Sequence, residues 1–528
     1  MRLKENTYSK ILLLFFLISV VYIAGFVLFT EFRKLIFITP DDASYYLKIA
    51  ENFPVGKGFT FDGINPTNGF QPLWQYLLIT LTYLNLRPEL MLRVIFLLQI
   101  ILLTISAMIL YKVQRKFFSK EILLPGGIIF ITFVFLKAVN GMETALLIFF
   151  ISLLYNYSVK NDLLNSQNNR KDLFAGMLLG LVILARLDTV FLAASIGFFS
   201  IAGILINSLN RTQQLKKLLY ISLGTILVVS PYMIYNLITF GNIIPISGYL
   251  KSGFPIVTFS DKFSFMMGYR EMFFAFFAII YFVWFCISYP KPVIRSSSIR
   301  SFCIYMGIFS LFTAMYFLYT VLFMNWVIFS WYFIYYALFA SLISALPFKY
   351  MLSSKIKFRR MIYIGATAFL LFYGVFKTYQ LYEGRYAVSG NNWNIESYNA
   401  ALWAKENTAP EEIFSMKDAG HFSYFSGRRV INLDGLVNNF EYQEILKNKN
   451  LNEYLKKHNV RFYVTHAIWD RDDITDGKYD TLMIKIPSHK YSLESDPLLL
   501  KKENELYRSA PYYDGEYRAA FIIWNLSY

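Results

Sequence analysis

The chain has 528 residues, of which 56% are hydrophobic, 19% are aromatic and only 16% are charged. A soluble protein carries about a quarter charged residues, so the composition excludes a chain that is soluble throughout and predicts an integral membrane protein. The net charge of +16 does not predict a nucleic-acid partner, because the basic residues fall largely in short loops between hydrophobic runs, where they orient spans. Cys286 and Cys303 lie within or near hydrophobic segments and indicate no disulfide framework.

Hydrophobic runs recur from Ile11 to Tyr379, and about 20 apolar residues cross a bilayer. The first run is longer than the apolar core of a secretion signal and no small-residue cleavage pattern follows it, so we expect an uncleaved span. We expect eleven spans in all, near residues 11–30, 90–111, 122–139, 143–159, 173–187, 189–206, 218–238, 271–289, 301–323, 327–348 and 361–380. The run 72–86 is short, and we interpret it as a helix lying at the outer surface.

Lys and Arg are shared unequally between the two sets of connections. The N-terminus and the loops 112–121, 160–172, 207–217, 290–300 and 349–360 together hold 21 of them, whereas the alternate connections, although longer, hold 8. The excess of basic residues in the first set predicts that this set is cytoplasmic. We therefore expect a multi-pass protein of the cell (inner) membrane, with a cytoplasmic N-terminus and an extracytoplasmic C-terminal part.

Two adjacent carboxylates, Asp41 and Asp42, follow Pro40 in the first outer loop, which we place at 31–89. Ionisable groups at a membrane boundary usually pair, bind an ion or take part in chemistry. The alternative is a helix start, because Pro favours the first helical position and carboxylates favour the first turn. Lys48 and Lys57, later in the loop, are phosphate contacts or simply solvated side chains.

Glu143 begins a predicted span on the same side as Asp41 and Asp42. One interpretation is a helix cap, since the helix dipole stabilises a carboxylate in the first turn. The other is a second acid of the site, which binds a divalent cation or orients an acceptor. Lys137 lies two turns earlier, where it pairs with Glu143, contacts a lipid phosphate or snorkels to the interface.

Arg186 and Asp188 interrupt an otherwise apolar run and divide it into two spans. They predict either a structural clasp at a tight reversal or a pair beside an active site. In the outer loop 239–270, which is rich in Gly and Pro, Lys251 is a candidate contact for an anionic lipid head group. The aromatic pair Trp331-Tyr332 is typical of an interfacial belt.

Residues 383–528 have the composition of a soluble domain, so we divide the chain into 1–382 and 383–528. Short apolar strands near 413–416, 428–435 and 460–464 alternate with helical stretches such as 442–458 and predict a small α/β domain. We expect Asp418 and Asp434, at strand ends, to be turn or cap residues. The four histidines, all in this part, are His421, His458, His466 and His489.

Several catalytic and nucleotide-binding motifs are absent from the sequence. It contains no phosphate-binding loop of the Walker type, no dinucleotide-binding glycine motif, no nucleophile elbow and no His-rich metal motif. Binding of a soluble nucleotide sugar by the membrane part is therefore unsupported.

The pattern of a first span, an acidic pair in a large outer loop, many spans and an outer C-terminal domain resembles the GT-C superfamily of membrane glycosyltransferases. The likeness is greatest to bacterial members of the protein O-mannosyltransferase, aminoarabinose transferase and arabinofuranosyltransferase type, and it covers roughly residues 1–350. The motifs that carry it are Asp41-Asp42-Ala43-x-x-Tyr46, Gly56-x-Gly58, Pro66-Thr67-Asn68-Gly69-Phe70-x-Pro72-Leu73-Trp74, Gly141-Met142-Glu143-Thr144 and Ala185-Arg186-Leu187-Asp188.

This resemblance implies a GT-C fold and transfer of a sugar from a polyprenyl-phosphate donor to a hydroxyl of a lipid, glycan or protein acceptor on the outer side. An acid of the first outer loop acts as the base in such enzymes, so Asp41 or Asp42 has this role in a single displacement with inversion. Retention with Glu143 as the nucleophile ranks lower. Candidate partners of the leaving phosphate are Lys251, Arg186 and Lys137, and the further candidate substrate contacts are Asp188 and Tyr46.

Some members of the superfamily use a divalent metal, Mg or Mn, and others use none. If a metal is present here, Asp42 and Glu143 are the candidate ligands. A histidine ligand in the membrane part is excluded, because all four histidines lie in the C-terminal domain.

Two other functions stay open at this point: a lipid-linked-sugar transporter or flippase, and a non-enzymatic assembly protein of the cell envelope. Transporters often have repeated halves with broken helices. The chain has no visible internal repeat, and its polar features lie on one predicted side. An assembly protein would tolerate the loss of Asp41 and Asp42.

Overall fold

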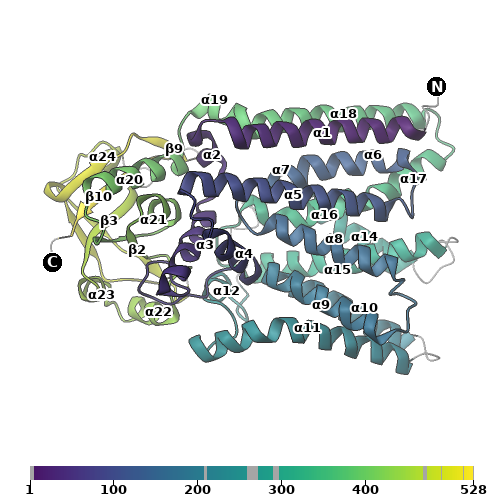
Figure 1. Cartoon of the computed structure of the whole chain (residues 1–528), viewed down its shortest axis with the longest axis horizontal. Helices are drawn as coiled ribbons and strands as arrows, with labels where there is room; N and C mark the ends of the chain where they lie inside the picture. The colour runs from purple at the N-terminus through teal and green to yellow at the C-terminus, as the bar shows by residue number, and fades with distance from the viewer. Residues whose placement is uncertain are drawn as a thin grey trace.

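A computed structural model of the chain describes residues 5–206, 211–257, 272–288, 297–467, 472–488, 490–514 and 517–526. The molecule has two parts (Figure 1): a bundle of long helices that run side by side, and a mixed α/β region at one end of it. The N-terminus lies at the far end of the bundle and the C-terminus lies in the α/β region.

The bundle and its connections contain α1 (Glu5–Phe29), α2 (Phe32–Ile38), α3 (Asp41–Asn52), η1 (Phe53–Lys57), α4 (Pro72–Thr82), α5 (Pro88–Gln114), α6 (Lys120–Ile129), η2 (Phe130–Phe135), α7 (Leu136–Ala138), α8 (Thr144–Lys160), α9 (Asn169–Ala185), η3 (Leu187–Thr189), α10 (Val190–Ile206), α11 (Arg211–Phe240), α12 (Ile246–Lys251), α14 (Met272–Ser288), α15 (Ser297–Phe323), η5 (Ser330–Phe333), α16 (Ile334–Ile343), α17 (Ala345–Ser353), α18 (Arg359–Tyr379), η6 (Gln380–Gly384) and α19 (Arg385–Ser389).

A helix is present at each of the eleven predicted spans. In the described part, eight helices are long and apolar enough to cross a membrane, and α8 and α14 are shorter apolar helices. The protein is therefore a multi-pass membrane protein. The remaining predicted span, 173–187, corresponds to α9, which has 17 residues. The run 72–86 forms α4, whose 11 residues are too few to cross a bilayer.

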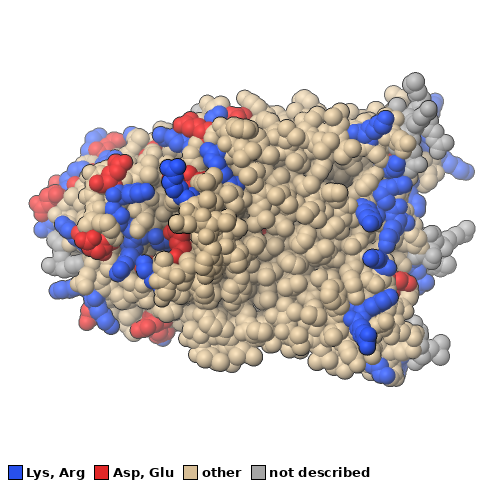
Figure 2. Space-filling view, in the orientation of Figure 1, with Lys and Arg blue, Asp and Glu red and all other residues tan. Residues whose placement is uncertain are grey.

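Charged side chains are confined largely to the two ends of the molecule (Figure 2). Lys and Arg gather at the end of the bundle away from the α/β region, and a broad belt of uncharged side chains separates them from the mixed charges of that region. Large apolar residues of the long helices, such as Ile226 and Phe372, are exposed, as expected of helices that face lipid.

The C-terminal region is a mixed sheet covered by helices, which confirms the predicted α/β class. Its helices are α20 (Trp393–Asn407), α21 (Gly420–Ser426), α22 (Phe440–Lys447), α23 (Leu451–Lys457), α24 (Asp472–Thr475) and η7 (Lys502–Asn504). Its strands are β1 (Ile413–Met416), β2 (Arg429–Asn432), β3 (Val460–Ala467), β4 (Thr481–Ile484), β5 (Pro487–Ser488), β6 (Leu493–Glu494), β7 (Leu498–Lys501), β8 (Glu505–Arg508), β9 (Tyr512–Asp514) and β10 (Tyr517–Asn525).

The main sheet has the order β2-β1-β3-β10-β8, with β9 also paired to β10. β1 lies parallel to β2 and β3, whereas β10 is antiparallel to β3 and β8. The predicted helical stretch 442–458 is two helices, α22 and α23, because the chain breaks at Lys449, where φ is +57°.

The first outer loop and the α/β region touch through their backbones at two glycines. A Cβ atom at Gly420 would lie 2.2 Å from the carbonyl oxygen of Asp41, and one at Gly69 would lie 1.9 Å from that of Leu436. Such distances are far below van der Waals contact, so only glycine fits at these points. The α/β region is therefore packed directly against α3 and the loop before α4.

Candidate active site

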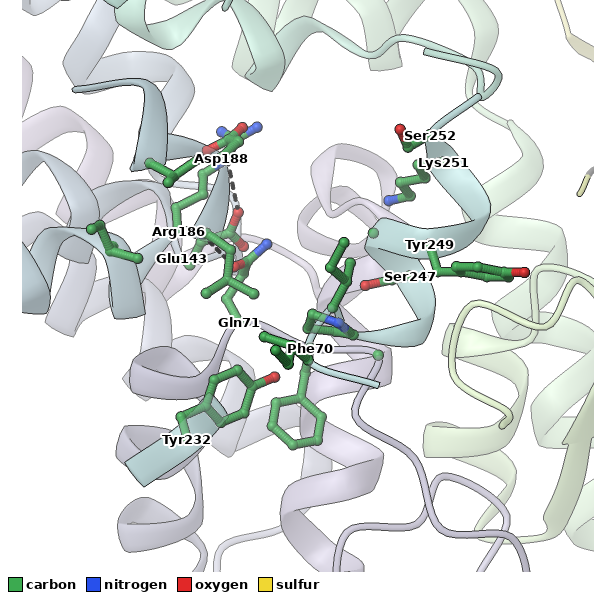
Figure 3. A pocket seen from close by; sticks show the side chains of 18 of the residues that line it. Phe70, Gln71, Glu143, Arg186, Asp188, Tyr232, Ser247, Tyr249, Lys251 and Ser252 are labelled. Carbon is green, nitrogen blue, oxygen red and sulfur yellow. Dashed lines mark hydrogen bonds and ion pairs between the residues drawn. The ribbon is translucent and has the colours of Figure 1, made fainter. Parts of the chain in front are cut away.

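A cavity of about 990 Å³ lies where the first outer loop, α12 and the α/β region meet the helical bundle. Its polar wall contains six of the predicted site residues, namely Asp42, Tyr46, Glu143, Arg186, Asp188 and Lys251. The residues come from segments that are up to about two hundred positions apart in the chain, and Figure 3 shows several of them around the cavity. The fold therefore brings together most of the residues that the sequence motifs singled out.

Asp42 lies in the first turn of α3 and lines the cavity. Its carboxylate makes no hydrogen bond or ion pair with the residues that the structure describes. Burial raises the pKa of Asp42 to about 6, opposed by the positive charge of Lys251 and reinforced by Asp434 and other carboxylates. A carboxylate with this pKa is ionised at neutral pH and is matched to the task of a general base.

Asp41, although adjacent in sequence, is held by the α/β region. Its two carboxylate oxygens accept hydrogen bonds from the backbone N–H groups of Gly420 at 2.8 Å and His421 at 2.6 Å. Asp41 does not line the cavity. The predicted helix start is present, since both acids lie in the first turn of α3, but neither side chain caps that helix.

Glu143, Arg186 and Asp188 form a buried charge cluster at one wall (Figure 3). Arg186 Nε lies 3.6 Å from Glu143 Oε1 and 3.2 Å from Asp188 Oδ2, and the side chains of Arg186 and Glu143 are each only 4% exposed. The hydroxyl of Tyr46 donates to Glu143 Oε2 at 3.0 Å. The guanidinium also lies over the rings of Tyr332 and Tyr335, 5.2 Å from each centroid.

Arg186 and Asp188 thus form an ion pair that also lines the cavity, which is compatible with both sequence interpretations. Glu143 stands just before α8, but its side chain makes no capping hydrogen bond. Glu143 forms an ion pair with Arg186, and Lys137, which lies in the short helix α7, does not line the cavity.

The turn that precedes Glu143 is held by hydrogen bonds to one side chain, that of Gln99. Gly141 has a φ of +83°, and the side chain of Gln99 from α5 accepts from the backbone N–H of Asn140 and of Gly141. The Gln99 amide also donates to the carbonyl of Met142 at 2.6 Å. The buried Gln99 side chain thus supplies hydrogen-bond partners for three backbone groups of this turn, which lies between α7 and α8.

Lys251 closes the opposite wall at the end of α12. Its side chain points across the cavity toward the Arg186 cluster (Figure 3). Burial alone would lower the pKa of Lys251, but Tyr332, Asp42 and Glu143 outweigh it and raise that pKa, so the ammonium stays charged. Lys251 makes no ion pair within 4 Å with a residue that the structure describes, and its charge is therefore free to meet a ligand.

The structure adds cavity residues that the sequence analysis did not select. Gln71 accepts a hydrogen bond from the backbone N–H of Leu187 at 2.9 Å and lay within the motif around Pro72, which was the available signal. Tyr316 is 1% exposed, and its hydroxyl has no partner among the described residues. Lys490 of the α/β region donates to the carbonyls of Tyr249 and Ser252. Neither Tyr316 nor Lys490 had any distinguishing sequence pattern.

A second limb of the cavity is apolar and runs between α9, α10 and α11. Its lining residues are Ile183, Val190, Phe191, Ala193, Ile226, Val229 and Met233. Val190 is 51% exposed and Ile226 is 59% exposed, so this part of the lining reaches the surface of the bundle. The cavity thus combines a charged wall with an apolar one.

The carboxylates of the cavity do not fit a divalent cation. Among the residues that the structure describes, no group of three or more His, Cys, Asp and Glu side chains is placed to hold a metal ion. Of the two predicted ligands, Glu143 is already paired with Arg186 and Tyr46, and Asp42 lies near the ammonium of Lys251. The positive charge of the site comes from Arg186 and Lys251.

Residues 382–515 match a sequence family described as a domain of unknown function (DUF8728). No curated protein matches the chain by sequence. Among solved structures, the chain is similar to the oligosaccharyltransferase AglB from Archaeoglobus fulgidus, in complex with an inhibitory peptide and a dolichol-phosphate. The TM-score is 0.50 at 14% identity, and the match covers 86% of this chain and 69% of AglB.

It is also similar to ArnT from Cupriavidus metallidurans bound to undecaprenyl phosphate. That match has a TM-score of 0.56 at 8% identity and covers 98% of this chain and 97% of ArnT. These likenesses concern the fold, and they confirm the resemblance that the sequence motifs indicated. The chain has the fold of the GT-C membrane glycosyltransferases.

Proposed function

We propose that the protein is a glycosyltransferase that moves a sugar from a polyprenyl-phosphate donor to an acceptor hydroxyl outside the cytoplasm. The observation that carries this proposal is the composition of one cavity: Asp42 and the cations Arg186 and Lys251 line its polar part, and apolar residues of α9, α10 and α11 that reach the bundle surface line the rest. A lipid-linked sugar phosphate needs these three features together. Polyprenyl or dolichol phosphate is bound in the two similar structures, which supports the same class of donor here.

Lys251 is the residue that we assign to the leaving phosphate. Arg186 already faces two carboxylates, so its charge is largely compensated, whereas Lys251 has no ion-pair partner among the described residues. A preorganised cation that meets charge as it develops lowers the barrier more than one that is neutralised beforehand.

The reaction that fits this arrangement is a single displacement. Asp42 takes the proton from the acceptor hydroxyl, the acceptor oxygen forms a bond to the anomeric carbon, and the bond from that carbon to the phosphate oxygen breaks. The electron pair leaves with the polyprenyl phosphate, and one displacement inverts the anomeric configuration. Retention through Glu143 is disfavoured, because that carboxylate is held by Arg186 and Tyr46 and is not free to attack.

We assign all eleven helices that match predicted spans as membrane crossings, with 1–382 as the membrane module and 383–528 as an extracytoplasmic domain. The N-terminus and the α/β region lie at opposite ends of the bundle, which requires an odd number of crossings (Figure 1). The basic residues at the N-terminal end support a cytoplasmic N-terminus and a location in the cell membrane (Figure 2).

The proposal is tested with purified protein in proteoliposomes and a panel of polyprenyl-phosphate sugars, with and without EDTA. We expect acceptor-dependent release of polyprenyl phosphate from at least one donor, undiminished by EDTA. Donor binding without sugar release across the panel, together with movement of labelled lipid between leaflets, would contradict the proposal and indicate a transporter. The choice of lipid, glycan or protein acceptor is read from which acceptor supports release.

Lys251→Ala is expected to raise the donor KM by about 10- to 100-fold, because a hydrogen bond to a charged group contributes about 1.5–3 kcal/mol. Lys57→Ala is the matched control, since Lys57 belongs to the same face, is exposed and does not line the cavity. Initial rates against donor concentration give both constants. An unchanged KM in Lys251→Ala would remove Lys251 from the phosphate site.

A further inference from the structure

His421 is a fully buried side chain that links the α/β region to both flanks of the acidic pair. Its Nδ1 lies 2.7 Å from the hydroxyl oxygen of Ser44, and its Nε2 lies 3.1 Å from the carbonyl oxygen of Thr39. A carbonyl only accepts, so Nε2 carries the proton and Nδ1 accepts from Ser44. Burial lowers the pKa of His421 to about 4, so the neutral ring that these two bonds require is the form present at physiological pH.

Two further residues of α3, Asp41 and Tyr45, also bond to the α/β region. Asp41 accepts from the backbone N–H groups of Gly420 and His421. The hydroxyl of Tyr45 donates to Asp434 Oδ2 at 3.0 Å and accepts from the backbone N–H of Ala419 at 3.1 Å. Four residues close to Asp42 in the chain are thus hydrogen-bonded to the α/β region: Thr39, Asp41, Ser44 and Tyr45.

Asp42 itself makes none of these bonds and lines the cavity instead. Successive residues of a helix point about 100° apart, so fixing Asp41, Ser44 and Tyr45 against one surface fixes the direction of Asp42 as well. At Gly420 the two backbones approach so closely that a methyl group does not fit. The contact therefore has one geometry and little freedom to shift.

We propose that the α/β region, whose sequence family has no known function, is a wall of the active site that positions Asp42 through Asp41, His421 and Asp434. This inference rests on the proposed function, in which Asp42 is the base. Asp41, Ser44, His421 and Gly420 are positioning residues in this scheme. The region sets the direction of the base and also its surroundings, because it supplies two of the carboxylates that face Asp42.

The groups that face Asp42 come from four segments. Lys251 stands on α12, Glu143 precedes α8, Asp418 and Asp434 belong to the α/β region, and Asp41 is the preceding residue. If the region moves away, Asp42 becomes more hydrated and loses two like-charged neighbours. Both changes lower the pKa of a carboxyl group, so the acid limb of the pH–rate profile moves to lower pH.

The inference is tested with Gly420→Ala, which forces a methyl group between α21 and α3, and with His421→Phe, which removes both side-chain hydrogen bonds. Gly365→Ala is the matched control, because nothing lies within 4 Å of a Cβ atom there. We measure kcat, donor KM and their pH dependence, and amide hydrogen exchange over residues 41–52. Gly420→Ala and His421→Phe are expected to lower kcat about tenfold or more, with donor KM within about twofold of wild type, because the phosphate contacts are untouched.

In the same two variants we expect the acid limb to move down by about one pH unit, and exchange over α3 to become faster. Asp41→Asn, which keeps one acceptor oxygen, is expected to retain more turnover than Asp41→Ala. An acid limb that stays in place while kcat falls would overturn the positioning role. Exchange over α3 equal to that of Gly365→Ala would overturn the attachment itself.

Failure of the proposed function is distinguishable from failure of this inference. If wild type releases sugar from no donor, the proposed function is wrong, and the exchange measurement still decides whether the α/β region holds α3. If Gly420→Ala does not fold, His421→Phe and the single-bond variant Ser44→Ala carry the same comparison.

Discussion

Asp42→Asn is expected to lower turnover by about 10²- to 10⁴-fold, the range that a positioned general base contributes. Asparagine has nearly the shape of aspartate but does not take up a proton, so the variant removes the chemistry and leaves the cavity. Because Lys251 and Arg186 are unchanged, binding of the polyprenyl-phosphate donor is expected to stay within a few-fold of wild type. Sugar release under single-turnover conditions and donor binding by fluorescence are the two measurements.

The pH dependence gives an independent check of the same assignment. The base works in its ionised form and its pKa is raised to about 6, so kcat/KM of the wild type should rise with pH and level off above about that value. Asp41→Asn is the companion variant: Asp41 bonds to the α/β region and does not line the cavity, so a smaller loss of turnover than in Asp42→Asn is expected. Undiminished turnover in Asp42→Asn would refute the mechanism, and an inactive Asp41→Asn beside an active Asp42→Asn would transfer the role to Asp41.

Arg186→Met is expected to have the largest effect on stability, a loss of about 3–5 kcal/mol in the free energy of unfolding. The guanidinium is 4% exposed and lies against two carboxylates, Glu143 and Asp188. Removing it leaves the buried Glu143 and the partly buried Asp188 without this counter-ion, which is far more costly than removing the whole cluster. Thermal unfolding of the detergent-solubilised protein, with and without donor, gives the measurement.

Two companion variants make this result specific. Arg186→Lys keeps the charge but loses the planar group that bridges both acids and lies over Tyr332 and Tyr335, so an intermediate loss is expected. Adding Glu143→Gln and Asp188→Asn to Arg186→Met should recover part of the stability, because the unpaired charges are then gone. A single Arg186→Met variant as stable as wild type would show that the cluster is not a structural clasp.

The helical segments were predictable from the amino-acid sequence, and the reason is local. A run of about 20 apolar residues is helical in lipid because each backbone group must be satisfied within the segment. Every predicted span accordingly coincides with a helix, from α1 to α18. Strands β1, β2 and β3 were predictable because buried strands are short apolar runs bounded by turn residues. The single predicted helix 442–458 failed at Lys449, where a left-handed backbone residue interrupts a sequence with a helical pattern.

The motifs around Asp42, Glu143, Arg186 and Asp188 also indicated residues that the structure brings together around one cavity. They did not determine the partners. Lys137 was a predicted partner of Glu143, and the ion pair of Glu143 with Arg186 was not predicted, because Arg186 lies more than forty residues later in the chain. The hydrogen bonds of Gln99 to the turn before Glu143 also join distant segments.

The choice between Asp41 and Asp42 shows most clearly what the tertiary structure alone decided. Two neighbours in a helix have the same local environment in sequence but point about 100° apart. Which of them faces the cavity depends on the contact of α3 with Gly420 and His421, residues almost four hundred positions later in the chain. The sequence by itself determined the helical segments, the α/β class of the C-terminal region and most of the charged residues that line the cavity. The pairing of these charges and the direction of Asp42 depend on contacts between distant segments, which no local pattern encodes.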